Sequence, residues 1–174
     1  MNETLNTLKT RRSVRGFDPK RMPSEDLINE VVMAGEYAPT GKGMQSPRII
    51  VVMNKEIRNK LSRLNAEVMG TSSDPFYGAP VIIIVLADKA RPTYLYDGSL
   101  VMGNLMNAAH AVGLGSCWIH RAKEVFYSAE GKAMLKEWGI DGDYEGIGHV
   151  ALGYPMTEPA PAKPRKEDYA VWVK

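Results

Sequence analysis

Residues 81–86 read Val-Ile-Ile-Ile-Val-Leu, a run of six large aliphatic residues of which five are β-branched. Such residues favour extended backbone, and the run shows no alternation with polar residues. It therefore predicts a strand covered on both faces. The next periodic segment, residues 97–112, is rich in small residues and is followed by Gly113, which indicates a helix that ends there.

Helices and strands also alternate on either side of this pair. Ser24 is a suitable N-cap for a helix over residues 25–38, which Pro39 ends, and Asn54 and Ser128 can cap later helices. The other predicted elements are a short helix around residues 5–8, strands 48–53, 116–120 and 146–153, and helices 57–68 and 128–139. This alternation predicts a layered α/β or α+β domain.

The composition narrows the class of protein. The chain has 174 residues, which favours one domain, and its 22 basic and 20 acidic residues leave a formal charge of +2. That balance argues against a surface built wholly for nucleic acid. The single cysteine excludes a disulfide framework and favours a reducing compartment. The longest apolar run, residues 81–87, is too short to span a bilayer. We therefore expect a soluble, cytoplasmic protein that binds neither nucleic acid nor membrane.

The C-terminal part of the sequence differs from the rest. Residues 155–164 are proline-rich and should be extended, and residues 169–173 resume a strand-like pattern. That final strand has no neighbouring partner in the sequence, which suggests that it pairs with another subunit.

A basic cluster near the N-terminus, Arg11-Arg12-Ser13-Val14-Arg15, is the most informative polar motif. In extended backbone Arg11, Ser13 and Arg15 would point to one side. Two guanidinium groups that flank a hydroxyl suit a phosphate group. A second basic group lies at residues 163–166, and the two could hold one phosphate if the fold brings them together. The alternative is that both clusters are ordinary solvated surface.

Two glycine-containing loops invite a ligand-binding interpretation. Residues 39–47 carry Gly41 and Gly43, which allow close approach to a flat ligand, and Gln45, which could bind a heterocycle edge. The alternative is a plain turn, and the spacing is not that of a P-loop. The Gly-Leu-Gly-Ser-Cys-Trp motif at 113–118 lacks the third glycine of a dinucleotide fingerprint and precedes a strand rather than a helix.

Cys117 could be a nucleophile with one of the three histidines as its base. It lies in an apolar segment, however, where cysteine usually behaves as a small buried side chain. The histidines show no zinc-site spacing, so we expect no metal site.

Taken together, these motifs resemble those of the nitroreductase family of flavin enzymes. In chain order, the segments that match the family's motifs are residues 11–17, 38–47, 79–86, 104–118, 150–155 and 163–166. The similarity covers essentially the whole chain.

The resemblance implies an α+β fold with a central mixed sheet flanked by helices, formed by residues 1–174 as a single domain. It also implies an intertwined homodimer with two FMN molecules at the interface. In that family the C-terminal arm, here residues 155–174, packs on the partner subunit, and its last strand joins the partner's sheet.

The resemblance also implies which residues bind FMN. Arg11, Arg12, Ser13 and Arg15, with Lys163 and Arg165, would surround the phosphate and ribityl chain. Pro39, Thr40 and Gly41 would pack against the isoalloxazine from the other subunit. Gln45, Asn65, Gly115 and Ser116 would complete the ring site.

Two departures from the family pattern concern the flavin ring. Val68 stands where many relatives place a lysine that faces the ring. Gly43, Ser46 and Arg48 stand where relatives often have an asparagine and an aromatic residue.

The implied activity is hydride transfer from NADH or NADPH to FMN and then to a nitroaromatic or quinone acceptor, with no catalytic side chain required. One alternative is a specialised flavin enzyme such as a dehalogenase or a flavin-consuming enzyme. Less favoured alternatives are a basic-patch module for nucleic acid and a hydrolase that uses Cys117.

Overall fold

The computed structural model describes residues 2–174. In chain order its regular elements are α1 (Glu3–Thr10), α2 (Glu25–Glu36), the 3₁₀ turn η1 (Gly41–Gly43), β1 (Pro47–Val52), α3 (Lys55–Met69), β2 (Val81–Asp88), α4 (Tyr94–Ala111), β3 (Gly115–Ile119), α5 (Ala122–Tyr127), α6 (Ala129–Glu137) and β4 (Tyr144–Gly153). The α+β class predicted from the sequence is therefore confirmed.

The four strands form one sheet in the order β1-β2-β4-β3, and every pair of neighbouring strands is antiparallel. The expectation of a mixed sheet is thus wrong for a single chain. Among the described residues, the only parallel pairing is an isolated bridge between Ser13 and Ser116. β1 and β3 are the edge strands, so β1 offers a backbone edge to a further strand.

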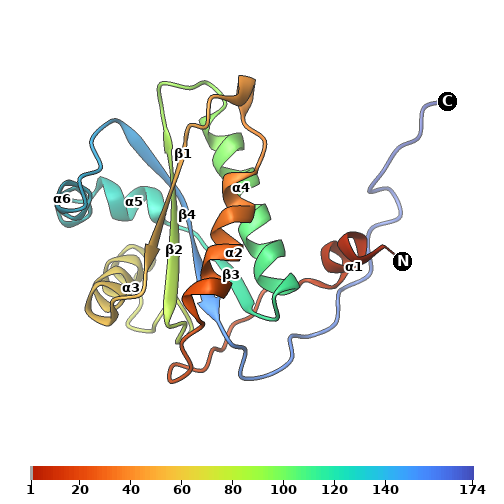
Figure 1. Cartoon of the computed structure of the whole chain (residues 1–174), viewed down its shortest axis with the longest axis horizontal. Coiled ribbons are helices and arrows are strands. Elements are labelled where there is room, and N and C mark those ends of the chain that lie inside the picture. Colours follow the sequence, from red (N-terminus) through yellow and green to blue (C-terminus); the bar gives the residue numbers. More distant parts are fainter. Residues whose placement is uncertain (1) are drawn as a thin grey trace.

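The sheet is covered by helices on both faces, as Figure 1 shows: α2 and α4 lie on one face, and α3, α5 and α6 lie on the other. Alternate residues of β2 enter two different cores. Ile82, Ile84 and Leu86 pack in the core beneath α3 and α5, and Ile83 and Val85 pack in the core beneath α2 and α4. All five side chains are fully buried, which explains why this strand has no polar alternation.

The helix boundaries follow from local capping. The side chains of Ser24, Asn54 and Ser128 accept backbone N–H groups at the starts of α2, α3 and α6, as predicted. Two details differ. α4 begins at Tyr94 rather than at residue 97, and α5, which has only 6 residues, was not predicted.

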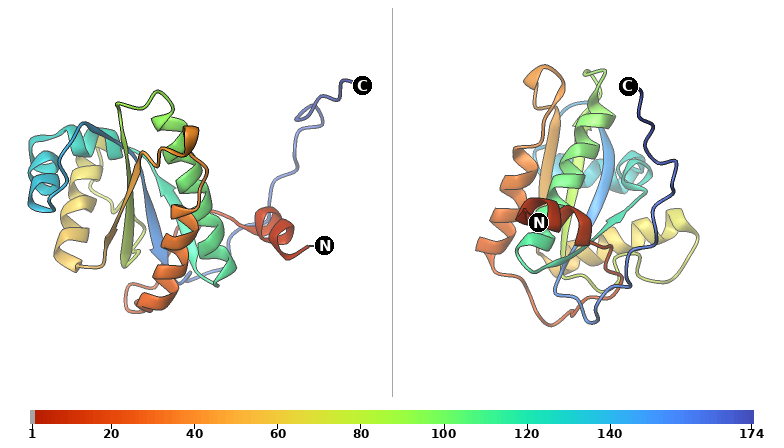
Figure 2. Two further views of the ribbon diagram at one scale, coloured as in Figure 1. Left: turned by 45° about the horizontal axis from the view of Figure 1, so that its top comes forward. Right: turned by 90° about the vertical axis from the view of Figure 1, so that its right-hand side faces the viewer.

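The C-terminal arm leaves this body altogether. Its last contacts with the chain are a bridge between Pro155 and Phe17 and a hydrogen bond from Met156 N to Gly16 O, 3.0 Å. Beyond them every residue is exposed, and the predicted strand 169–173 does not form within this chain. Figures 1 and 2 show the arm and α1 projecting on the same side of the molecule. No helix among residues 2–174 is both long and apolar enough to cross a bilayer.

Candidate functional site

The basic segment at residues 11–15 runs in extended form from the end of α1 along β3. Val14 N donates to Ser116 O at 2.9 Å, and Ser13 forms a parallel bridge with Ser116. The approach is close because Gly115 has no side chain: a Cβ there would lie 2.9 Å from Cγ2 of Val14. The main chain, rather than any ion pair, therefore fixes this segment on the sheet.

The arginines of this segment carry free hydrogen-bond donors. Nη1 of Arg11 and Nε of Arg12 are buried and have no partner among the described residues. None of the ion pairs among residues 2–174 involves Arg11, Arg12 or Arg15. A buried donor without an acceptor is costly, and an anion with several oxygens would satisfy both groups.

Arg12 has a second role, because its Nη1 donates to Lys9 O at 2.8 Å and to Arg11 O at 2.6 Å. Its guanidinium therefore closes the C-terminal end of α1, where a cation is favoured by the helix dipole.

The charges of the arginine segment at residues 11–15 act on Cys117 of β3. Burial raises the pKa of the Cys117 thiol, while the charge of Arg15, a hydrogen bond from Ser13 and the charge of Arg11 oppose that rise. The charges of Arg11 and Arg15 thus both act on one point of β3. That Arg11, Ser13 and Arg15 share one side of the segment stays a prediction. Cys117 itself is 3% exposed, which does not favour a nucleophilic role.

His110 borders the same site from the C-terminal end of α4. Its Nε2 lies 2.9 Å from Oγ1 of Thr10. Partial burial and then the charges of Arg11 and Arg12 lower the pKa of His110. The lowered pKa disfavours a positive charge on His110, so the positive charge of this part of the site comes from the arginines.

The glycine loop between α2 and β1 is held at the other end of α4 by Asp97. Oδ1 of Asp97 accepts Gly41 N at 2.9 Å, and Oδ2 accepts Ser46 Oγ and Thr93 Oγ1, both at 3.0 Å. The sequence predicted the loop as a ligand-binding candidate but not its buried carboxylate anchor. An acidic residue in the first turn of a helix was the available signal, but it usually indicates only a favourable helix end.

A cleft of about 640 Å³ opens beside this loop. Thr40, Gln45 and Ser46 line it together with Arg48 and Arg91. Gln45, predicted to meet a heterocycle, therefore lies at a cavity rather than in a plain surface turn.

The two parts of the candidate site lie far apart within one chain. Asp97 holds the loop at the first turn of α4, and His110 meets the N-terminal segment at its last turn. At 1.5 Å per residue, this spacing places them about 20 Å apart. Gly115 and Ser116 lie at the N-terminal segment, whereas Pro39, Thr40 and Gly41 lie at the loop. Lys163 and Arg165 lie on the exposed arm, and neither is in any of the ion pairs among residues 2–174.

Asn65 has a structural role within the chain. It is fully buried in α3, where its Nδ2 donates to His120 O at 2.8 Å and its Oδ1 accepts Nε of Arg121 at 3.0 Å. Asn65 thus fixes the turn between β3 and α5, at which Arg121 has a positive φ of 74°. Each of its two polar atoms makes one hydrogen bond and can make a second, so its contact with a flavin stays a prediction.

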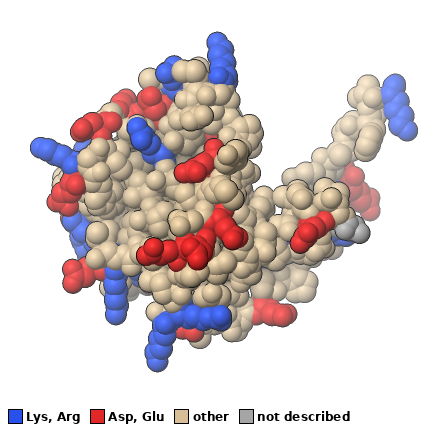
Figure 3. Space-filling model, in the orientation of Figure 1, with Lys and Arg blue, Asp and Glu red and all other residues tan. Residues whose placement is uncertain are grey.

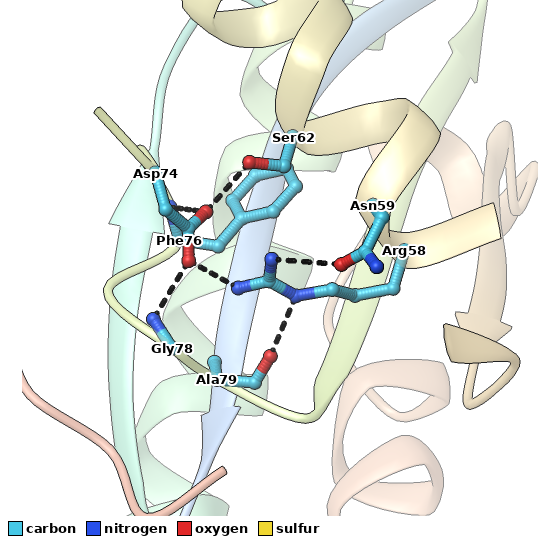
Figure 4. Close-up of polar contacts among 7 residues, drawn as sticks. All are labelled: Arg58, Asn59, Ser62, Asp74, Phe76, Gly78 and Ala79. Carbon is cyan, nitrogen blue, oxygen red and sulfur yellow. Dashed lines mark hydrogen bonds and ion pairs between the residues drawn. The ribbon is translucent and has the colours of Figure 1, made fainter. Parts of the chain in front are cut away.

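A separate polar cluster fixes the loop between α3 and β2 (Figure 4). The Asp74 carboxylate pairs with Arg58 and accepts Ser62 Oγ at 2.7 Å and Gly78 N at 2.8 Å. Arg58 Nε also donates to Ala79 O at 2.9 Å. This cluster contains none of the expected ligand-binding residues, and its partners are satisfied, so it stabilises the fold. No group of His, Cys, Asp and Glu side chains in residues 2–174 could hold a metal ion.

The comparisons with known proteins agree with this fold. The model of the nitroreductase family matches residues 8–75 and 68–154. The chain is an α+β protein of the nitroreductase fold, and it belongs to the nitroreductase family. The resemblance found in the sequence is thus confirmed.

Three similar proteins define the likeness further. A protein of Archaeoglobus fulgidus with the provisional name NADH dehydrogenase/NAD(P)H nitroreductase is 30% identical over 164 residues, 91% of this chain and 88% of that protein. The crystal structure of a nitroreductase with bound FMN from Bacteroides fragilis is 28% identical, with a TM-score of 0.90 and full coverage of both chains. The corresponding FMN-bound structure from Desulfitobacterium hafniense is also 28% identical over the full length of both chains, with a TM-score of 0.88.

Proposed function

We propose that this protein is an FMN-dependent oxidoreductase that transfers hydride from NADH or NADPH to nitroaromatic, quinone or similar acceptors by a ping-pong mechanism. The observation that carries the proposal is the pair of unpaired, buried donors on Arg11 and Arg12 beside Ser13, in a chain of the nitroreductase family. These groups suit the phosphate of FMN. Full-length similarity to two FMN-bound structures supports the choice of cofactor.

Bound FMN would supply the redox chemistry, taking hydride at N5 from the nicotinamide and passing it to the acceptor in a second half-reaction. The side chains of this protein bind and orient. Arg11, Ser13 and Arg15 would hold the phosphate and ribityl chain, and the backbone of Gly115 and Ser116 would border the ring. No acid or base side chain is assigned.

The site requires a second copy of the chain in this proposal. The loop of residues 39–41 and the arginine segment lie at opposite ends of α4, so a site that uses both is built from the loop of one chain and the arginines of another. The arm supports the same assembly. Its Tyr169, Trp172 and Val173 are 80%, 83% and 95% exposed, and a partner's sheet edge, such as that of β1, would cover them. Lys163 and Arg165 would then reach a phosphate on the dimer.

The visible spectrum of the purified protein tests the proposal most directly. We expect a yellow protein. Its visible flavin absorption band should disappear on anaerobic addition of NADH or NADPH and return when a quinone or nitroaromatic compound is added. A protein reconstituted with FMN that oxidises neither nicotinamide with any such acceptor would refute the assignment.

The same preparation separates the proposal from the nucleic-acid alternative. A basic-patch module would be colourless and would bind DNA with a steep salt dependence. Figure 3 shows basic and acidic side chains interspersed on the face viewed, which does not favour such a module there. A cytoplasmic location, expected from the cysteine content, stays a prediction.

A further inference from the structure

The loop between α2 and β1 has a conformation that it would not adopt unaided. Lys42 and Gln45 have positive φ values of 54° and 50°, and Gly43 between them has a φ of 66°. Non-glycine residues in this region are strained, and such strain persists only where surrounding contacts enforce it. The contacts that enforce this loop therefore decide where its side chains lie.

Within the loop, hydrogen bonds define the turn but do not attach it to the body. Gly43 N donates to Thr40 O at 2.9 Å, and Gln45 N donates to Thr40 Oγ1 at 3.0 Å. These bonds would move with the loop if it swung outward. At the C-terminal end of the loop Asp88 N donates to Ser46 O at 3.1 Å, so it is the Gly41 side that needs a further attachment.

Asp97 provides that attachment, because its carboxylate grips the loop on both sides of the strained residues. Gly41 precedes them and bonds to Oδ1, while Ser46 follows them and bonds to Oδ2. Asp97 is 3% exposed, so these bonds are shielded from water. Its place in the first turn of α4 adds a favourable interaction with the helix dipole.

The fit at this point leaves no room for displacement toward the helix. A Cβ at Gly41 would lie 2.3 Å from Thr93 Oγ1, and that hydroxyl itself donates to Asp97. Thr93, Asp97 and the loop backbone therefore form one packed unit. A shift of Gly41 would break a bond to the carboxylate in one direction and clash with Thr93 in the other.

We infer that Asp97 is a positioning residue for the flavin: it holds Pro39, Thr40 and Gly41 in the place from which they pack against the isoalloxazine. This inference rests on the proposed function. Asp97 does not itself touch the cofactor, since its side chain is buried beneath the loop and both of its oxygens are already bonded to the chain.

The test measures FMN binding to apoprotein by quenching of flavin fluorescence. Asp97→Ala should raise the Kd by about tenfold or more, the loss expected when charge-assisted hydrogen bonds no longer fix the contact surface. Its bound flavin should also show a visible spectrum closer to that of free FMN. Asp97→Asn should restore the Kd to within about threefold of the wild type, because its carbonyl oxygen can accept Gly41 N–H and its amide can donate to the two hydroxyls.

Leu61→Ala is the matched control for stability alone. Leu61 is fully buried in α3, in the core on the opposite face of the sheet. This variant should lower Tm by a similar amount yet leave the Kd for FMN unchanged. If the Kd rises equally in both variants, affinity merely follows stability and the inference is wrong.

Three further outcomes distinguish a failure of the role of Asp97 from a failure of the proposed function. If Asp97→Ala does not fold, Ser46→Ala, which removes one bond to the carboxylate, should still raise the Kd about threefold, and an unchanged value overturns the inference. If the wild type binds FMN and Asp97→Ala binds it equally well, only the role of Asp97 is refuted. If the wild type binds no FMN, the proposed function fails and the inference fails with it.

Discussion

Val14 N donates to Ser116 O at 2.9 Å, and this backbone bond places the arginine segment on the edge of β3. The segment is therefore positioned on β3 by its main chain, and of its three arginines only Arg12 donates a side-chain hydrogen bond to another described residue. Because the backbone holds the segment, no carboxylate of the chain is needed to position it. One donor of Arg11 and one of Arg12 therefore remain unpaired among the described residues. A site prepared in this way can accept an anion without first breaking an internal ion pair.

Arg11→Ala should weaken FMN binding by about 1.5–3 kcal/mol, the range for a hydrogen bond to a charged group. That corresponds to a rise in Kd of roughly 10- to 150-fold, measurable by flavin fluorescence. Arg63→Ala is the control, since Arg63 lies on α3 and pairs only with Glu67 and Glu130. Equal affinity of Arg11→Ala and wild type would place the phosphate elsewhere.

Removal of the arm should separate folding from assembly. A chain ending at residue 156 loses no buried residue, since everything beyond is exposed, and we expect its far-UV circular dichroism to retain the helical signal. It should sediment as a monomer and bind FMN poorly.

Two double variants assign these losses to different parts of the arm. Tyr169→Ser/Trp172→Ser should weaken the dimer and keep the cations. Lys163→Ala/Arg165→Ala should keep the dimer and weaken FMN binding. A dimer that survives truncation with full affinity for FMN would contradict the proposed role of the arm.

The helices and strands that were predicted correctly are those that a single local sequence pattern identifies. β2 was recognisable because both of its faces are buried, and α2, α3 and α6 because Ser24, Asn54 and Ser128 cap them. α5 was missed because it has only 6 residues and begins after a left-handed residue, Arg121, which carries no helix-start signal.

The residues of the candidate site also differ in how far their roles could be predicted from neighbouring sequence. The arginine segment was recognisable because residues 11–15 are consecutive in the sequence. The alternation did not indicate that the neighbours Arg11 and Arg12 both carry a buried donor without a partner among the described residues. The role of Asp97 depends on Ser46, 51 positions away, and is visible only after folding. The structural role of Asn65 could not be predicted either, because its partners His120 and Arg121 lie more than 50 positions away in the sequence.

Asp74→Ala should destabilise the protein by about 1–3 kcal/mol, because it leaves Arg58 and two backbone N–H groups without their acceptor. The effect should depend on pH. Burial alone would raise the pKa of Asp74, but hydrogen bonds from Arg58, Ser62, Gly78 and Phe76 outweigh it and lower the pKa below 3.8. The contribution is therefore present above that ordinary value and is lost as pH falls through the lowered one.

Urea unfolding at pH 7 and pH 3 measures this effect. Wild type should lose more stability between the two than Asp74→Asn does. Asp143→Asn is the control, because Asp143 is 73% exposed and pairs only with Lys89. If wild type and Asp74→Asn lose the same free energy of unfolding between pH 7 and pH 3, the Asp74 carboxylate does not contribute to the pH dependence of stability.

His149 should make the protein sensitive to acid in a higher pH range. It is fully buried on β4 between Phe76 and Phe126, with ring centroids 5.3 and 6.0 Å away. Neither ring nitrogen meets hydrogen-bond geometry with any described residue, although the backbone of Ile119 and His120 lies beside the ring. Burial, aided by the charge of Arg121, lowers the pKa of His149 from 6.5 to about 4.

The sign of the effect follows from proton uptake. Between pH 6.5 and pH 4 His149 is protonated in the unfolded chain but not in the folded chain. The free energy of unfolding therefore falls as pH falls through this range. The loss attributable to His149 should approach about 3 kcal/mol at pH 4. His149→Leu should remove that part of the slope in urea unfolding followed from pH 7 to pH 4. His120→Gln, at an exposed position, should retain it. If His149→Leu and wild type lose stability in parallel across this range, the folded protein accepts the proton at His149 and the core around Phe76 and Phe126 admits a charge.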